Sequence, residues 1–328
     1  MSSKPGSPSR PSILIVSPAL AAANNGNWHT AARWARLLRG HCRTAIVAAW
    51  SGEPCDLMIA LHARRSAPSI DAFALTHPPH APIVVLTGTD LYRDIRTDAA
   101  AQRSLQQAGA LVVLQELGRQ ALPEAARGKC SVIYQSAARL EPVAPPGAVL
   151  RVVQVGHLRE EKDPHCFMRA ALRLRARRDI RFVQVGGALD AALGDAAVRT
   201  QAEGANYRWL GDLPRSVARQ HIRHAHLLVN TSRMEGGAQV IVEAARSSTA
   251  VLASRVDGNV GMLGPAHAGL FELGDDASLA ALIERARGEP AFLALLREQT
   301  VARGPLFEPA EEQRRLLQLV RTALETRS

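Results

Sequence analysis

The 328-residue sequence has little of the features that mark several protein classes. No apolar run approaches the roughly 20 residues that a membrane-spanning helix needs, so we expect no stable membrane insertion. Aromatic residues make up only 4% of the chain, which leaves few platforms for stacking nucleic-acid bases. We therefore interpret the net charge of +10 as a solvated surface that favours phosphorylated ligands, and expect no nucleic-acid partner.

Cysteine is scarce and dispersed. Cys42, Cys55, Cys130 and Cys166 form no C-x-x-C pair, which argues against structural zinc and suits a reducing compartment. The N-terminal stretch MSSKPGSPSRPS is not followed by an apolar segment of signal-peptide length. The sequence therefore predicts a cytoplasmic protein whose residues 1–11 form a disordered leader.

Lysine is nearly absent, and the basic residues are overwhelmingly arginine. It occurs only at positions 4, 129 and 162. Lys162 follows an apolar run closely and is a candidate for contacting phosphate. The alternative is a solvated residue at the start of a helix.

Short β-rich runs alternate with helix-length segments along both halves of the chain. This alternation predicts α/β domains with parallel, doubly wound sheets. The prolines and glycine at 142–147 interrupt the pattern and mark a linker. We predict a first domain over 12–147, a second over 148–305, and a C-terminal helix within 306–328 that crosses back to the first. Ligands of such folds bind beyond the carboxyl ends of the strands, so we expect the site in a cleft between the domains.

The second half carries glycines, basic residues and carboxylates where its apolar runs end. Gly236 and Gly237 are expected to open a helix whose free N–H groups attract a diphosphate, so no metal or other cofactor is needed. On that helix Glu235 and Glu243 would lie ~12 Å apart along the axis. A carboxylate accepts two hydrogen bonds and can match a vicinal diol. The alternative for Glu243 is a position on the solvent side. The full set of donor-site candidates here is Gly156, His157, Lys162, Gly187, Asp212, Leu213, Glu235, Gly236, Gly237, Ala238 and Glu243.

The first half has polar residues at equivalent strand ends. Arg64 and Arg65 could bind a phosphorylated acceptor, because one guanidinium group can donate two parallel hydrogen bonds to phosphate oxygens. Asp90 could orient or deprotonate an acceptor, or could cap a helix. The stretch 25–29 could equally form a simple turn and N-cap. The acceptor-site candidates are Asn25, His62, Arg64, Arg65, Thr87, Gly88, Thr89 and Gln135; Gly26 and Asn27 join the donor site, and His29 and Asp90 join the catalytic candidates.

Three segments resemble a known family. SRMEGGAQVIVEAARSSTAVLAS is similar to the E-x7-E signature of group 1 glycosyltransferases with the two-Rossmann-domain GT-B fold. VGHLREEKD resembles that family's phosphate-binding loop, and NWHTAARWARLL resembles its first helix. The resemblance implies two Rossmann-like domains facing across a cleft, transfer from a UDP-sugar, and no metal. It also implies that Glu235 holds the sugar, Glu243 the ribose, and Lys162 with Gly236 and Gly237 the departing UDP.

Other segments narrow the resemblance. NNGNWHTAARWARLL, ALHARRSAPSI, VVLTGTDLYRDI and GNVGMLG are together similar to a branch associated with selenosugar synthesis in the selenoneine pathway. That branch implies transfer from a UDP-sugar, in particular UDP-N-acetylglucosamine, to selenophosphate. Three positions depart from the wider family: His157 replaces an arginine, Thr87 a histidine, and Gln135-Ser136 an Asn-Gly pair. The last two departures fall where an acceptor should bind.

Two rival functions are compatible with the same sequence. A conventional group 1 glycosyltransferase would act on a polysaccharide or glycolipid and would expose an apolar or basic patch on its first domain. A non-catalytic UDP-sugar-binding protein, such as a sensor or a DNA-binding regulator, would bind ligand without turnover. The absence of a helix-turn-helix or zinc-module motif argues against the regulator.

Overall fold

The computed structural model describes residues 10–20, 26–78, 80–143 and 147–325. The chain divides into two compact units, which we describe separately. Unit 1 comprises residues 1–114, 119–133 and 310–328, and unit 2 comprises residues 115–118 and 134–309. Residues 134–143, which the sequence placed in the first domain, therefore cluster with unit 2, and residues 310–325 cluster with unit 1.

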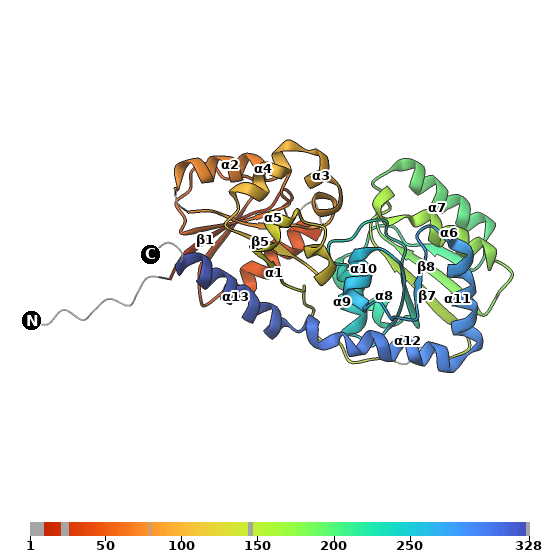
Figure 1. The fold of residues 1–328 in the computed structure, drawn as a ribbon. Helices are drawn as coiled ribbons and strands as arrows, with labels where there is room; N and C mark the ends of the chain where they lie inside the picture. Colours follow the sequence, from red (N-terminus) through yellow and green to blue (C-terminus); the bar gives the residue numbers. More distant parts are fainter. Residues whose placement is uncertain (1–9, 21–25, 79, 144–146, 326–328) are drawn as a thin grey trace, which may run out of the picture. The chain divides into compact units, whose positions relative to one another are not determined.

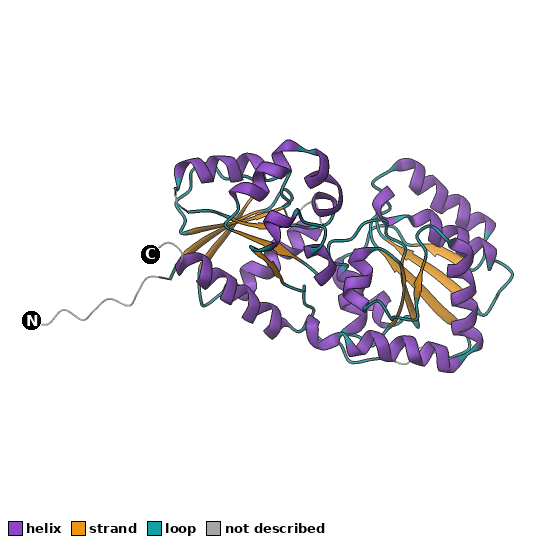
Figure 2. Ribbon diagram, in the orientation of Figure 1, coloured by secondary structure: helices purple, strands orange, loops and turns teal. Residues whose placement is uncertain are grey.

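Unit 1 is built on a six-stranded parallel sheet of order β2-β1-β3-β4-β5-β6. Its strands are β1 (Ser12–Val16), β2 (Arg43–Val47), β3 (Leu57–Leu61), β4 (Ile83–Val85), β5 (Ala110–Val113) and β6 (Cys130–Val132). Its helices are α1 (Gly26–Leu38), α2 (Ala67–Thr76), a π-helical turn (Asp90–Asp94), α3 (Ile95–Thr97), α4 (Ala99–Gln107), α5 (Glu124–Arg127) and α13 (Pro309–Glu325). Both sheet faces are covered by helices (Figures 1 and 2).

Alternation of side chains across the strands produces the two cores of unit 1. On β3, Leu57 and Ile59 point to the face covered by α1 and α13, while Met58 and Ala60 point to the face covered by α2 and α4. The C-terminal helix is fixed within unit 1 by Glu312, whose carboxylate accepts hydrogen bonds from Arg33 Nε at 2.9 Å and Trp34 Nε1 at 2.8 Å.

Unit 2 repeats the design with a parallel sheet of order β12-β11-β10-β7-β8-β9. Its strands are β7 (Leu150–Val155), β8 (Ile180–Val185), β9 (Tyr207–Trp209), β10 (Leu227–Asn230), β11 (Ala250–Ser254) and β12 (Leu270–Phe271). Its helices are α6 (Pro164–Arg173), α7 (Ala191–Glu203), α8 (Arg215–Arg223), α9 (Gln239–Ala245), α10 (Asp257–Leu263), α11 (Asp276–Gly288) and α12 (Pro290–Ala302). The α/β class with two doubly wound parallel sheets, predicted from the alternation, is confirmed.

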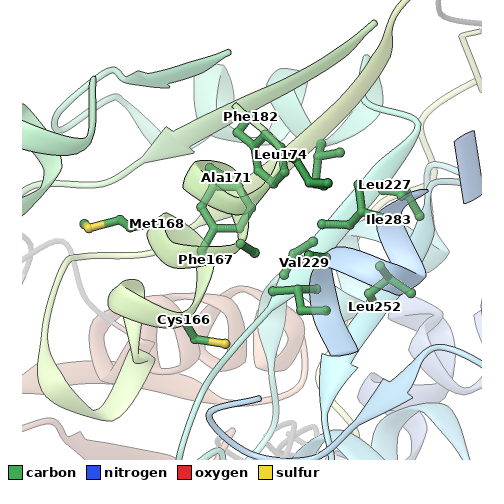
Figure 3. Close-up of a cluster of buried hydrophobic side chains, with 14 of the residues drawn as sticks. Cys166, Phe167, Met168, Ala171, Leu174, Phe182, Leu227, Val229, Leu252 and Ile283 are labelled. Carbon is green, nitrogen blue, oxygen red and sulfur yellow. The ribbon is translucent and has the colours of Figure 1, made fainter. Parts of the chain in front are cut away.

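The largest core of unit 2 lies between α6, α11 and the strands. Phe167 of α6 meets Phe182 of β8 edge to face, with ring centroids 5.4 Å apart. Leu227, Val229 and Leu252 join them from neighbouring strands (Figure 3). This apolar layer holds the strands in register, and therefore also the loops that leave their carboxyl ends.

Candidate functional site

The strand order of unit 2 reverses between β7 and β10. Chain order runs outward from β7 through β8 and β9 on one side, and from β10 through β11 and β12 on the other. The carboxyl ends of the two strands at such a reversal diverge, and ligands of doubly wound folds bind there. The loops that leave β7 and β10 carry Lys162 and Glu235.

These two residues form an ion pair at the reversal point. Lys162 Nζ lies 2.5 Å from Glu235 Oε1, which also accepts the Ser232 hydroxyl at 2.6 Å. Glu235 is buried, whereas the Lys162 side chain is 23% exposed. Burial alone would raise the pKa of Glu235, but Lys162 and Ser232 hold that pKa below its ordinary value. The site therefore contains a fixed carboxylate and an accessible ammonium, which has further N–H donors to offer an anion.

Several glycines of unit 2 lie where a side chain would collide with the loops that carry Glu235, His157 and Asp212. A Cβ on Gly258 would lie 1.9 Å from the Glu235 carbonyl oxygen, and one on Gly186 would lie 2.0 Å from the Gly156 carbonyl oxygen. A Cβ on Gly187 would lie 3.2 Å from Asp212 Cβ and 3.6 Å from His157 Nδ1. Gly156, Gly187, His157 and Asp212 are thus close together, and Gly156 lies beside the Lys162 side chain.

A buried hydrogen-bond ladder reaches this loop across the sheet. The Tyr207 hydroxyl donates to Gln184 Oε1, Gln184 Nε2 to Gln154 Oε1 at 2.7 Å, and Gln154 Nε2 to Thr231 Oγ1 at 2.5 Å. Thr231 Oγ1 in turn donates to the carbonyl oxygens of Lys162 at 2.7 Å and Asp163 at 2.9 Å. Every bond runs in the same direction, toward the Lys162 backbone. The ladder fixes a turn in which Asp163 has the left-handed φ of 41°.

Glu243 is buried, so the alternative that placed it on the solvent side is wrong. Its Oε1 accepts two hydrogen bonds from Arg215 of α8, from Nη2 at 3.0 Å and from Nε at 3.3 Å. Both contacts use the same oxygen. Arg215 comes 28 residues earlier in the chain and was not among the residues identified from the sequence.

The predicted start of the following helix is also wrong. α9 begins at Gln239, because Ala238 has an extended conformation with φ −73° and ψ 97°. Gly236 and Gly237 therefore lie in the preceding loop, and the expected ~12 Å spacing of Glu235 and Glu243 along one helix does not apply. Ala238 makes no side-chain cap, so the first turn of α9 has no N–H group bonded to its N-cap side chain. Leu213 lies in the loop between β9 and α8.

Further residues of this site have only weak sequence signals. Asn230 Nδ2 donates to Asn259 Oδ1 at 3.2 Å, and Asn259 Nδ2 donates to the Ser254 carbonyl at 3.0 Å. Asn230 also contacts Glu235 Oε1 at 3.4 Å, and its Oδ1 accepts the Ser232 N–H. The polar N-T-S that ends the apolar run of β10 is the signal that could have identified Asn230 and Ser232.

In unit 1 the strand order reverses between β1 and β3. The loop that leaves β3 holds His62, Arg64 and Arg65, and the loop that leaves the neighbouring β4 holds Thr87, Gly88 and Thr89. The His62 N–H donates to the Val85 carbonyl at 2.8 Å, which joins the two loops. These acceptor-site candidates are therefore neighbours.

Asp90 has a structural role in these loops. It is fully buried; Oδ1 accepts the N–H groups of Thr87 at 2.9 Å and Gly88 at 3.0 Å, and Oδ2 accepts that of Ala63 at 2.9 Å. Both carboxylate oxygens thus accept backbone N–H groups, which hold the two loops together. Asp90 therefore braces the two loops and makes no helix-capping bond, because its donors lie in the β3 loop or before the π-helical turn.

The other first-half candidates are dispersed. Arg64 is tied through Nε to Asp94 Oδ2 at 2.8 Å, while Arg65 is exposed. Gly26, Asn27 and His29 lie in the first turn of α1, where the Thr30 hydroxyl donates to the Gly26 carbonyl at 2.9 Å. Asn25 falls outside the described residues. Gln135 is buried and clusters with unit 2.

The described residues contain neither a metal-binding cluster nor a membrane-spanning helix. No group of three or more His, Cys, Asp or Glu side chains that could hold a metal ion occurs in residues 10–20, 26–78, 80–143 and 147–325. Over the same ranges, no helix has the length and hydropathy needed to cross a bilayer.

Comparison with solved structures finds the same fold at low sequence identity. Sucrose-phosphate synthase from Thermosynechococcus elongatus is 17% identical, with a TM-score of 0.79 over 97% of this chain and 100% of the other. Anabaena HepE in complex with UDP-glucose is 14% identical, with a TM-score of 0.76 over 95% and 100%. The pneumococcal O-GlcNAc transferase GtfA in complex with UDP and GlcNAc is 15% identical, with a TM-score of 0.67 over 81% of this chain and 57% of the other.

The sequence itself is matched by one family model, "Glycosyl transferases group 1", over residues 150–287. No curated protein matches it. The matched segment contains the β7 loop, the Lys162–Glu235 pair, Glu243 and the sheet that carries them. This segment of unit 2 is therefore similar to the group 1 glycosyl transferases, and the chain has the GT-B fold of two Rossmann-like units.

Proposed function

We propose that the protein transfers a sugar from a UDP-sugar to a small anionic acceptor, with UDP-N-acetylglucosamine as donor and selenophosphate as acceptor. The observation that carries the donor half is the Lys162–Glu235 pair at the strand-order reversal of unit 2, 2.5 Å between Nζ and Oε1. The solved structures of HepE with UDP-glucose and of GtfA with UDP and GlcNAc support a nucleoside-diphosphate sugar as donor.

The two carboxylates suit two different parts of the donor. Glu235 is an anion held by Lys162 and Ser232, and it would accept hydrogen bonds from sugar hydroxyls. Glu243 uses one oxygen for Arg215, so its second oxygen would take a ribose hydroxyl. Lys162 would stabilise the negative charge that develops on UDP as the anomeric C–O bond breaks.

The acceptor half rests on the β3 and β4 loops of unit 1 and on the selenosugar-branch resemblance of their sequences. Arg64 and Arg65 supply positive charge at exposed positions. Selenophosphate is already anionic, so its selenium would attack the anomeric carbon without a general base. That requirement agrees with Asp90 being bonded to backbone N–H groups.

The test is UDP release from UDP-N-acetylglucosamine with and without selenophosphate. The proposal predicts release that depends on selenophosphate. Release that depends instead on a polysaccharide or glycolipid acceptor would establish the conventional glycosyltransferase. UDP binding without turnover in the presence of every acceptor would establish a UDP-sugar-binding protein.

We also propose that transfer needs no divalent metal, because Lys162 can neutralise charge on the departing diphosphate. Turnover should be unchanged in excess chelator, and Lys162→Met should lower it by about 100-fold or more, as loss of a charged transition-state contact does. Loss of wild-type turnover in chelator, restored by magnesium or manganese, would refute this.

A further inference from the structure

Unit 2 contains a hydrogen-bond chain through a histidine and a threonine, and every acceptor in this hydrogen-bond chain is a protein atom. His267 Nδ1 accepts the Gly269 N–H at 3.1 Å, so in the neutral ring the proton lies on Nε2. Nε2 contacts Thr300 Oγ1 at 3.3 Å, and the Thr300 hydroxyl donates to the Leu296 carbonyl at 2.7 Å. Each donor in this chain has an acceptor, and both residues are buried.

His62 in unit 1 begins a chain of the same kind. Its Nδ1 accepts the Arg65 N–H at 3.3 Å, and its Nε2 contacts Thr89 Oγ1 at 3.1 Å. The ring is buried, and burial lowers the pKa of His62 although Asp90 and Asp94 partly oppose this effect. The neutral ring with its proton on Nε2 therefore donates to the Thr89 oxygen.

The two hydrogen-bond chains differ at the threonine hydroxyl. The Thr300 hydroxyl donates a hydrogen bond to the buried Leu296 carbonyl, whereas the half-buried Thr89 hydroxyl has no acceptor within the described part of the chain. Since its oxygen already accepts from His62, the hydroxyl is left as a donor to whatever occupies the loop.

The position of His62 is held at a conformational cost. Its φ is 73°, a left-handed value that non-glycine residues rarely adopt. Such strain concentrates where the surrounding structure needs a particular side-chain placement. The residue lies at the strand-order reversal of unit 1, immediately before the exposed Arg64 and Arg65.

The charged side chains beside His62 and Thr89 favour an anionic ligand. Asp94 accepts Arg64 Nε at 2.8 Å and Arg93 Nε at 3.1 Å, so it orients Arg64 through one edge of the guanidinium. The Nη groups of Arg64 remain as donors on a side chain that is 41% exposed. The Thr89 hydroxyl, together with Arg64 and Arg65 on the β3 loop, supplies the hydrogen-bond donors that the oxygen atoms of a phosphate-type group accept.

We infer that Thr89 donates a hydrogen bond to an oxyanion of the acceptor, and that His62 is a neutral positioning residue that acts through Thr89. This inference rests on the proposed function for the identity of the acceptor. It revises the sequence interpretation, in which His62 was itself an acceptor-binding candidate.

The test uses Thr89→Val, His62→Asn and the double variant in the full chain. Asparagine tolerates positive φ but is too short to replace the imidazole contacts. Thr89→Val should raise the KM for selenophosphate by about tenfold, the usual scale for one lost hydrogen bond, and leave the KM for the UDP-sugar within about twofold. His62→Asn should raise the selenophosphate KM by a smaller factor. The double variant should match Thr89→Val, because His62 acts through that hydroxyl.

Thr300→Val is the matched control, since it breaks the closed chain in unit 2. It should lower the melting temperature and leave the selenophosphate KM unchanged. An unchanged selenophosphate KM in folded Thr89→Val, or a double variant whose effects multiply, would overturn the inference.

A binding measurement separates this inference from the proposed function. Calorimetric titration of wild-type protein and Thr89→Val with thiophosphate requires no turnover. Tighter binding to the wild type would support the oxyanion site even if no acceptor releases UDP. Equal binding to both proteins, in an enzyme that does release UDP, would overturn the site and leave the proposed function standing.

Discussion

At the scale of single residues, the two glutamates of the EGGAQVIVEA segment have different surroundings. Glu235 shares its Oε1 with a lysine and a serine, whereas Glu243 shares its Oε1 with an arginine from another helix. The sequence pattern identified both carboxylates. It could not identify Arg215, because that contact depends on how α8 packs on α9.

These surroundings predict separable effects. Glu243→Gln should weaken UDP binding by about 1–3 kcal/mol, the range for losing a charge-assisted hydrogen bond. Glu235→Gln should leave UDP affinity nearly unchanged but depress turnover, because it would contact the sugar. Calorimetry and steady-state kinetics measure the two effects. Glu272→Gln, a surface carboxylate paired with Arg255 at 3.1 Å, serves as the control and should change neither. Unaltered UDP affinity in Glu243→Gln would remove the ribose role.

At the scale of elements, the sequence predicts the strands well and the loops poorly. Continuous apolar runs such as 150–155 and 180–185 become β7 and β8, since a strand covered on both faces needs apolar side chains throughout. The two-residue β12 was missed because it is too short to form a pattern. The start of α9 was misplaced because glycine pairs mark a loop as readily as a helix start.

The ladder from Tyr207 to Thr231 makes an element-scale prediction. Burial raises the pKa of Tyr207, so its hydroxyl remains a donor in neutral solution. Tyr207→Phe would leave Gln184 Oε1 without this donor and should cost about 1–3 kcal/mol of unfolding free energy. Because the ladder ends on the Lys162 carbonyl, the KM for the UDP-sugar should also rise several-fold.

A core substitution serves as the control, because it lowers the unfolding free energy without displacing the Lys162 loop. Phe292 lies on α12 in the core of the same unit. Phe292→Leu should destabilise the protein and leave the hydrogen bonds of the ladder intact. An equal KM for the UDP-sugar in wild type and Tyr207→Phe would show that the ladder serves stability alone.

At the scale of the whole molecule, buried neutral histidines should govern stability in mildly acidic solution. Burial lowers the pKa of His267 to about 4, below its ordinary value of 6.5. The unfolded chain therefore takes up a proton at higher pH than the folded chain. The stabilising contribution is complete above pH 6.5 and is lost as pH falls toward 4, by up to about 3 kcal/mol.

Denaturant unfolding at pH 7 and pH 4.5 measures this loss. His267→Gln, which cannot take up a proton there, should lose clearly less stability than the wild type between these two values. Identical losses in both proteins would assign the acid sensitivity to other groups, of which His62, His221 and His226 also have lowered pKa values.

The proposed function depends on activation of a UDP-sugar at the Lys162–Glu235 pair of unit 2. The most direct measurement is selenophosphate-dependent release of UDP from UDP-N-acetylglucosamine by the wild type, Lys162→Met and Lys129→Met in parallel. Lys129 bonds to backbone carbonyls in unit 1 and is the matched lysine control. We predict release by the wild type and by Lys129→Met, and a loss of about 100-fold or more in Lys162→Met. Equal release by Lys162→Met and the wild type would contradict this prediction.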